Sequence, residues 1–273
     1  MNGGRFHATV HLLRPTHWPF LWMHAFAGFL VAALGSGGER VPAFWLSGLV
    51  AGGVWAVLLG GPAAGLTAAF SKPHEINGLS LNERPILAWT ALGMIMAGLL
   101  LAAVINWFFF DVYLMGLVLV ICHATPPIRL GQFQLGRLLT LALGLGALTF
   151  WSGCATAGMG FENIAWAGPY LGGFAFLTLA LWILLRQLRV RWGPVLFGMS
   201  LVGTFACLSV GVVRVGQNWY ALALFLPPLG AWTLLGVARF NPSSWREYIP
   251  AVGLAGLAWV LTDASLVMGL LLG

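Results

Sequence analysis

The sequence predicts an all-α integral membrane protein, built as a bundle of nine transmembrane helices. Nine apolar stretches are long enough to cross a bilayer, 60% of the 273 residues are hydrophobic and 7% are charged. Because hydrocarbon offers no water to backbone amides, each crossing must satisfy them internally as a helix of about 20 residues. The predicted helices cover residues 19–36, 44–70, 87–106, 109–124, 138–157, 164–185, 193–213, 218–238 and 249–272.

The whole chain, residues 1–273, is predicted to form a single membrane domain. Residues 1–18 make a cytoplasmic N-terminal segment, and residues 19–273 make the nine-helix bundle. The polar N-terminal run leads into an apolar run that has no clean small-residue cleavage site. We therefore expect the first helix to be retained.

The basic residues predict the orientation, because short cytoplasmic loops retain Lys and Arg. With the N-terminus inside, only Arg40 and Arg214 lie outside. Eleven basic residues then lie on the cytoplasmic face: Arg5, Arg14, Lys72, Arg84, Arg129, Arg137, Arg186, Arg189, Arg191, Arg239 and Arg246. We predict an inner, cytoplasmic membrane protein with a non-cytoplasmic C-terminus. The net charge of +6 follows from this distribution, so the expected partner is the lipid bilayer and not nucleic acid.

Closely spaced small residues predict tight helix packing, since they let helices approach one another in lipid. Pairs at four-residue spacing include Gly48 with Gly52, Gly61 with Gly65, and Gly168 with Gly172. The three cysteines form no C-x-x-C pair, and we interpret them as small packing residues too.

Polar residues at the membrane edge are the best guide to function, because the composition of the apolar helices mostly reflects the lipid around them. Four cytoplasmic segments stand out: Leu13–Phe20 (LRPTHWPF), Ser71–Ile86 (SKPHEINGLSLNERPI), Ala124–Leu130 (ATPPIRL) and Arg186–Pro194 (RQLRVRWGP). All four lie on the same predicted face.

Three of these segments resemble motifs of the UbiA superfamily of intramembrane prenyltransferases. Arg14, Pro15 and Trp18 match an R-P-x-x-W element before the first helix, and residues 82–86 (NERPI) resemble the end of the loop after the second. Residues 123–130 (HATPPIRL) are similar to the Y-S-x-P-P-L-R-L-K element after the fourth helix. The resemblance implies a UbiA-like bundle of nine helices. Within the superfamily, the chain looks most similar to chlorophyll and bacteriochlorophyll synthases.

The resemblance also shows what the chain lacks. Family enzymes hold Mg²⁺ and a prenyl diphosphate with aspartates from two motifs, after the second and sixth helices, and Mg²⁺ demands such oxygen ligands. Residues 69–77 (AFSKPHEIN) contain no Asp, and residues 186–192 (RQLRVRW) carry three cations instead. Only Glu75 and Glu83 remain in the first loop. We therefore expect no catalytic residue and no metal site.

The family-equivalent loops still supply candidate ligand-binding side chains. Arginine can hold a diphosphate by charge-assisted hydrogen bonds, although a pocket without metal loses much of the leaving-group stabilisation that transfer needs. Alternatively, the arginines anchor the topology at anionic headgroups. The candidates are Arg14, Trp18, Lys72, Glu75, Asn82, Arg84, Arg129, Arg186, Arg189 and Arg191.

Three further polar residues are candidates for buried or pigment-binding roles. His24 lies inside the first predicted helix, where it needs a hydrogen-bond partner or ligates the central metal of a chlorin. His123 stands where the family has Tyr, so we expect an interfacial hydrogen bond. Asp263 lies deep in the last predicted helix, where Thr262 and Ser265 can satisfy it in part.

These observations favour a non-catalytic UbiA-fold protein, an accessory or structural subunit or a lipid-binding scaffold of a membrane complex. No cofactor is required, and the central cavity that the resemblance implies can hold an isoprenoid, quinone, carotenoid, chlorin or phospholipid tail. The expected partners are other membrane subunits, such as those of a reaction-centre or light-harvesting complex. One alternative is a divergent prenyltransferase that uses Mg²⁺ with Glu75, Glu83 and the arginines. Another is a membrane transporter, although the sequence lacks an intramembrane file of ionisable groups.

Overall fold

The structure, a computed structural model, describes residues 18–35, 41–70, 84–186 and 192–215. Within these ranges all regular secondary structure is helical, as predicted. The α-helices are α2 (Trp18–Gly35), α3 (Val41–Leu58), α4 (Gly60–Phe70), α5 (Arg84–Ile105), α6 (Trp107–Ala124), α7 (Gln134–Leu141), α8 (Thr149–Thr156), α9 (Ile164–Arg186) and α10 (Gly193–Val215). The predicted helices at 218–238 and 249–272 lie outside the described residues, so the number nine stays a prediction.

Five helical segments of the described chain are long and apolar enough to cross a membrane. They are Leu46–Phe70, Arg84–Ile105, Trp107–Ala124, Gln134–Thr156 and Val195–Arg214. These segments confirm the prediction of an all-α membrane protein.

Proline marks the start of four helices. Pro19, Pro42, Pro85 and Pro194 are each the second residue of their helix, in α2, α3, α5 and α10. Proline has no N–H to donate, and the first-turn N–H groups of a helix have no acceptor within it, so proline costs nothing there. This explains why α5 begins at Arg84, earlier than the predicted residue 87.

Two of the predicted helices are interrupted within the bundle. The second is divided at Leu59 into α3 and α4, although the Leu59 amide still donates to the Trp55 carbonyl at 3.2 Å. The fifth contains a π-helical segment, Ala142–Leu148, between α7 and α8. The Thr149 hydroxyl donates to the Gly144 carbonyl at 2.8 Å, five residues back, which gives that carbonyl a partner in the wider turn.

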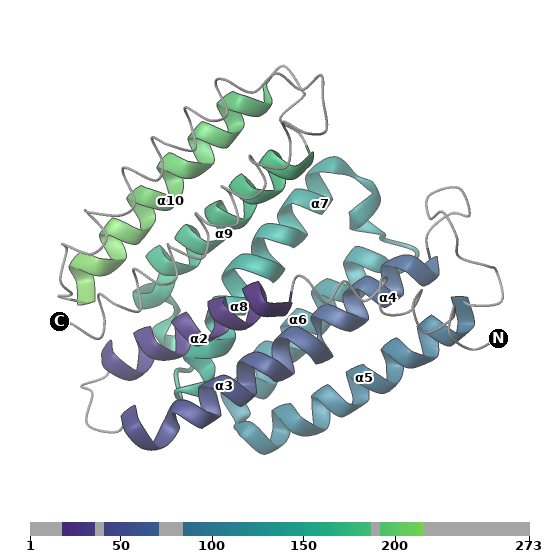
Figure 1. Cartoon of the computed structure of the whole chain (residues 1–273), viewed down its shortest axis with the longest axis horizontal. Helices are drawn as coiled ribbons and strands as arrows, with labels where there is room; N and C mark the ends of the chain where they lie inside the picture. The colour runs from purple at the N-terminus through teal and green to yellow at the C-terminus, as the bar shows by residue number, and fades with distance from the viewer. Residues whose placement is uncertain (1–17, 36–40, 71–83, 187–191, 216–273) are drawn as a thin grey trace.

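The helices pack as neighbouring pairs (Figure 1). α9 lies along α10, α2 lies against α8 and α3, and α4 lies against α5. The largest fully buried side chains come from several of these helices and include Phe29, Trp55, Tyr113, Trp151 and Phe174. The core therefore runs between α2, α3, α6, α8 and α9.

Glycines allow the closest helix contacts. A Cβ on Gly48 would lie 2.6 Å from the Phe29 ring, and one on Gly52 would lie 2.7 Å from the Trp22 ring, so the predicted packing of this pair on α2 is confirmed. Gly168 differs, because a Cβ there would meet nothing within 4 Å. The tightest approach was not predicted: a Cβ on Gly153 of α8 would overlap the carbonyl of Ala25 on α2.

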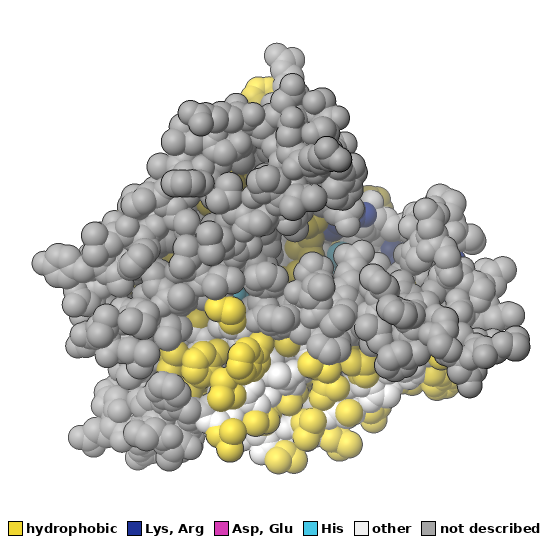
Figure 2. Space-filling model, in the orientation of Figure 1, with side chains coloured by type: hydrophobic (Ala, Val, Ile, Leu, Met, Phe, Trp, Pro, Cys, Tyr) yellow, Lys and Arg dark blue, Asp and Glu magenta, His cyan; other side chains and the backbone are white. Residues whose placement is uncertain are grey.

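The outer faces of the described helices are apolar. On α5, Trp89 is 72% exposed and Val104 is 81% exposed. Figure 2 shows yellow side chains over the lower face, where Figure 1 places α5. Such a surface suits contact with lipid tails.

Candidate functional site

Polar side chains gather at the end of the bundle where α4 and α6 end and where α5 and α7 begin. We call this region the basic end and define it by Arg84, His123, Arg129, Arg137 and Thr140. Arg84 is the first residue of α5, Arg129 lies in the connection after α6, and Arg137 is in the first turn of α7. Figure 2 shows dark blue and cyan atoms near each other on the right of the molecule.

Arg129 links the connection after α6 to the end of α4. Its backbone is left-handed, with φ of 39°, and its guanidinium donates to the carbonyl of Phe70, the last residue of α4. The last carbonyls of a helix have no partner within it and carry partial negative charge, so a cation there is favourable. Arg129 therefore stabilises the end of α4, and its remaining N–H groups can still bind a ligand.

Arg137 holds the same connection from the other side. Its Nε donates to the Gly131 carbonyl at 2.8 Å. Gly131 lies against His123, because a Cβ on Gly131 would be 2.8 Å from the imidazole Nε2. The close approach of these two segments therefore depends on glycine at position 131.

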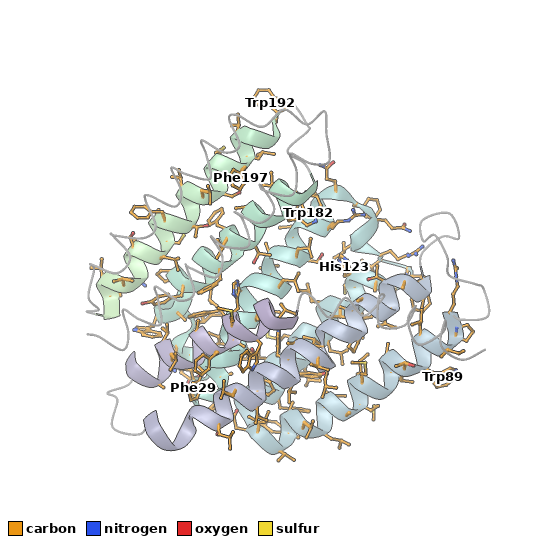
Figure 3. All side chains as sticks on the ribbon, viewed as in Figure 1. Phe29, Trp89, His123, Trp182, Trp192 and Phe197 are labelled. Carbon is orange, nitrogen blue, oxygen red and sulfur yellow. The ribbon has the colours of Figure 1, made fainter. Side chains whose placement is uncertain are left out.

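His123, which is labelled in Figure 3, makes a hydrogen bond to α7. Its Nδ1 lies 2.6 Å from the Thr140 hydroxyl oxygen, and that hydroxyl lies 2.9 Å from the Gly136 carbonyl. Thr140 is 6% exposed and His123 is partly buried, so this contact is shielded in part from the surroundings. The hydrogen bond fixes the ring of His123 relative to the start of α7.

Arg84 lies beside the end of α4. One turn further along α5, Leu87 packs against Ala68 and Ala69 of α4. The Nε of Arg84 is buried and has no hydrogen-bond partner among the described residues. A buried donor without a partner is costly, so this guanidinium has unused capacity to bind an anion.

The charges of the described residues are segregated between the two ends. Three arginines lie at the basic end, whereas the described carboxylates, Asp111 and Glu162, lie at the other end, near the starts of α6 and α9. Arg214 also lies there, and it donates to the Ala165 carbonyl at 3.1 Å. Within the described ranges, the charged side chains of the basic end are thus all arginines.

The structure places three of the residues that the sequence singled out at this end of the bundle: Arg84, His123 and Arg129. Trp18 begins α2 and Arg186 ends α9. Sequence reasoning did not select Gly131 or Thr140 and counted Arg137 only for orientation, although Arg137 follows the PPIRL element closely. The other candidates lie outside the described residues: Arg14, Lys72, Glu75, Asn82, Arg189, Arg191 and Asp263.

His24 lies in the core, away from the basic end. It is fully buried on α2, with its ring edge-on to Phe174 of α9 at 4.6 Å between centroids. Its proposed roles, as a hydrogen-bonding group or as a chlorin ligand, stay predictions. Among the residues that the structure describes, no three His, Cys, Asp or Glu side chains lie close enough to hold a metal ion.

A polytopic helical membrane protein with one basic end is the class that the fold and the site define. Its fold is that of the UbiA proteins, as the sequence motifs predicted. A structure from a study of digeranylgeranylglyceryl phosphate synthase superimposes with a TM-score of 0.64 at 10% identity, over 98% of this chain and 99% of that chain. A UbiA homologue from Archaeoglobus fulgidus superimposes with a TM-score of 0.53 at 16% identity, over 94% of this chain and 98% of that chain.

The same homologue has been solved bound to GPP and Mg²⁺, and that structure matches with a TM-score of 0.51 at 15% identity, over 95% of this chain and 99% of the other. At these identities the similarity establishes the fold alone. No protein-family model and no curated protein sequence matches this chain.

Proposed function

We propose that this chain is a non-catalytic UbiA-fold membrane protein that holds the anionic head of an isoprenoid or lipid ligand with arginines, without magnesium. The observation that carries the proposal is the basic end, where Arg84, Arg129 and Arg137 lie with no carboxylate among the described residues. Guanidinium groups bind phosphate oxygens directly by charge-assisted hydrogen bonds.

The sequence of the two family-equivalent loops supports the same proposal. Residues 69–77 contain no Asp, and residues 186–192 carry three arginines. Magnesium that bridges a diphosphate needs carboxylate oxygens, and its charge stabilises the departing group. Without such ligands, binding of the head is retained more easily than transfer of the prenyl chain.

Calorimetry on the full chain in detergent tests this proposal with geranyl diphosphate as the probe. We expect binding whose affinity is the same in Mg²⁺ and in EDTA. Arg137→Gln should weaken the binding, because it removes a cation from the basic end. Arg214→Gln is the matched control at the opposite end and should have no effect. A large gain in affinity with Mg²⁺ would contradict the proposal.

A divergent prenyltransferase is the second candidate, and the shared fold with a structure from the study of digeranylgeranylglyceryl phosphate synthase favours it. In that case Glu75 and Glu83 would supply the magnesium ligands. Transfer of a radioactive prenyl group to a membrane acceptor would then be detected, and it would disappear in Glu75→Gln. We expect no transfer above the rate without protein.

We propose further that the protein is an accessory subunit of a membrane complex. The motif similarity to chlorophyll and bacteriochlorophyll synthases motivates a photosynthetic complex, and the N-terminal segment is the candidate docking element. Native electrophoresis after mild extraction should show a hetero-complex, and deletion of residues 2–12 should weaken it. If the protein extracts as a monomer with only a bound lipid, this result would contradict the subunit proposal but not the proposal of ligand binding.

A further inference from the structure

We propose that α4 is a hinged arm, which pivots at Pro62, is held at this pivot by Tyr113, and is released at its far end when a ligand engages Arg129. Release by a ligand rests on the proposed function, in which the basic end holds an anionic head, whereas the pivot itself does not. Binding at the basic end then changes the shape of the bundle.

Pro62 leaves one carbonyl of its helix without the usual donor. In an α-helix the carbonyl of residue 58 accepts from the N–H of residue 62, and proline has no N–H. Leu58 ends α3, and Pro62 is the third residue of α4. Both lie inside the membrane-crossing segment Leu46–Phe70, where hydrocarbon offers no water in place of the lost donor. Gly60 and Gly61 also disfavour a helix, so the segment is weakest at this point.

The hydroxyl of Tyr113 supplies the missing hydrogen bond. It donates from α6 to the Leu58 carbonyl at 2.6 Å. The side chain is fully buried, with its ring edge-on to that of Trp55 at 6.4 Å between centroids. A Cβ on Gly98 of α5 would overlap the hydroxyl oxygen, so glycine at this position makes room for it. Tyr113 therefore holds the break between α3 and α4 from a neighbouring helix.

The part of the segment beyond the break packs lightly. In α4, whose sequence is GGPAAGLTAAF, the largest side chains are those of Leu66 and Phe70. Phe70 is 40% exposed, whereas Trp55 of α3 is 2% exposed in the main core. Ala68 and Ala69 contribute one methyl group each to the contact with α5. A helix with few large buried side chains is displaced at lower cost than one with many.

The far end of α4 is held by a cation of the proposed site. Arg129 donates to the carbonyl of Phe70, the last residue of α4, and α4 runs from the break toward the basic end (Figure 1). A phosphate binds a guanidinium through two parallel hydrogen bonds, which turn its donors toward the ligand. A ligand that takes Arg129 in this way loosens the bond to Phe70.

The length of the arm sets the size of the movement. α4 has 11 residues and is therefore about 16 Å long. A pivot of about 15° at its first turn moves its far end by about 4 Å. Such a shift is large enough to measure between two spin labels.

The test measures distances between pairs of spin labels on the full chain in detergent. The arm pair joins Thr67→Cys on α4 to Val195→Cys at the start of α10, and both positions are exposed. The control pair joins Leu46→Cys on α3 to Val213→Cys near the end of α10, on the other side of the pivot, where both positions are exposed too.

The background for labelling carries Cys122→Ser and Cys207→Ser. Cys154 is fully buried, so it is kept.

Release of the far end is tested in two ways. Geranyl diphosphate should shift the mean distance of the arm pair by about 3 Å, because Thr67 lies seven residues beyond Gly60, and should leave the control pair unchanged. Arg129→Gln removes the guanidinium from the Phe70 carbonyl and should give the same shift without ligand. No shift in Arg129→Gln, or no shift with a ligand that calorimetry shows to be bound, would overturn the inference and leave the proposed function intact. Failure of the ligand to bind would overturn both.

The pivot is tested without ligand by a pair of substitutions. Tyr113→Phe removes the donor to the Leu58 carbonyl, so the distances of the arm pair should spread more widely. Pro62→Ala restores an N–H for that carbonyl within its own helix. Tyr113→Phe should therefore have no effect on the distances when it is combined with Pro62→Ala. Pro42→Ala is the matched control, because Pro42 is the second residue of α3 and takes no donor from a carbonyl of that helix.

Pro62→Ala alone should reduce the shift that geranyl diphosphate produces to less than about half, since a continuous helix resists bending. Equal spreading by Tyr113→Phe with and without Pro62→Ala would overturn the inference. If Tyr113→Phe does not fold, Pro62→Ala still decides, because a ligand-induced shift that it leaves unchanged would overturn the pivot.

Discussion

Trp55 of α3 donates its indole N–H to the hydroxyl of Thr149 at the start of α8, over 2.9 Å. Both side chains are buried, and the Thr149 hydroxyl in turn donates a hydrogen bond to the Gly144 carbonyl in the π-helical segment. In a hydrocarbon surrounding, neither the indole nor the hydroxyl has water as a substitute partner. The pair therefore joins α3 to α8 at the point where the π-helical segment ends and α8 begins.

Trp55→Phe should destabilise the protein, because it leaves the Thr149 hydroxyl without its donor and shrinks a buried ring. We expect a loss of about 1–3 kcal/mol in the free energy of unfolding, measured by reversible unfolding in mixed micelles. Thr149→Val removes the other partner. The double variant should lose less than the sum of the two single losses, and strict additivity would contradict the coupling.

Gly28→Ala and Gly153→Ala should each disrupt the contact between α2 and α8. A Cβ at either position would overlap a backbone carbonyl, of Phe150 and Ala25 respectively, and a backbone cannot move aside as a side chain can. We expect losses of about 1–3 kcal/mol or more. Gly53→Ala is the matched control, since a Cβ there meets nothing within 4 Å. Equal thermal stability of all three variants would show that α2 and α8 are further apart.

Asn106 should stabilise two helices, α6 and α8. Its Oδ1 accepts from the Phe109 amide at 2.7 Å and so caps the start of α6, while its Nδ2 donates to the carbonyls of Ala155 and Thr156 at 3.1 and 3.2 Å at the end of α8. Asn106→Ala should cost about 1–2 kcal/mol in unfolding free energy.

Asn106→Asp separates the two roles of this side chain. The carboxylate keeps the cap of α6, but it loses the donor and faces two carbonyl oxygens. We therefore expect it to be at least as destabilising as Asn106→Ala in the same unfolding measurement. A variant as stable as wild type would mean that only the cap contributes.

Arg129 offers a test of its left-handed backbone. Arg129→Gly and Arg129→Ala both remove the guanidinium from the Phe70 carbonyl, but only glycine adopts a φ of 39° without steric cost. Arg129→Gly should therefore be more stable than Arg129→Ala by about 1 kcal/mol, as a difference in unfolding free energy. The reverse order would rule out this conformation.

The orientation is testable with one cysteine introduced at either end of the bundle. Gln132 and Glu162 are both exposed, and they lie at the basic end and at the opposite end respectively. From the distribution of basic residues we expect a membrane-impermeant maleimide added outside spheroplasts to label Glu162→Cys and not Gln132→Cys, with wild-type protein as the control. A reporter fused after Gly273 should be non-cytoplasmic, and its activity in the cytoplasm would contradict the nine-helix topology.

The sequence by itself determined that the chain lies in a membrane, that it is helical and that its basic residues are segregated. Long apolar stretches can only be helices in hydrocarbon, and four helices begin with proline in their second position, so the helix positions followed from local chemistry. The motif HATPPIRL likewise pointed to the connection that holds His123 and Arg129. These features depend on composition and short-range order, which a sequence displays directly.

Only the tertiary structure decided which residues of distant segments meet. Nothing local distinguishes Gly28 and Gly153 from the other 35 of the 37 glycines, and their role appears only where α2 crosses α8. The same is true of Gly131 beside His123, of Thr140 as its partner, and of the Phe70 carbonyl as the acceptor for Arg129. The hydrogen bonds of His123 to Thr140 and of Arg129 to Phe70 join residues 17 and 59 positions apart, and such contacts are set by how the helices pack and not by the sequence near each residue.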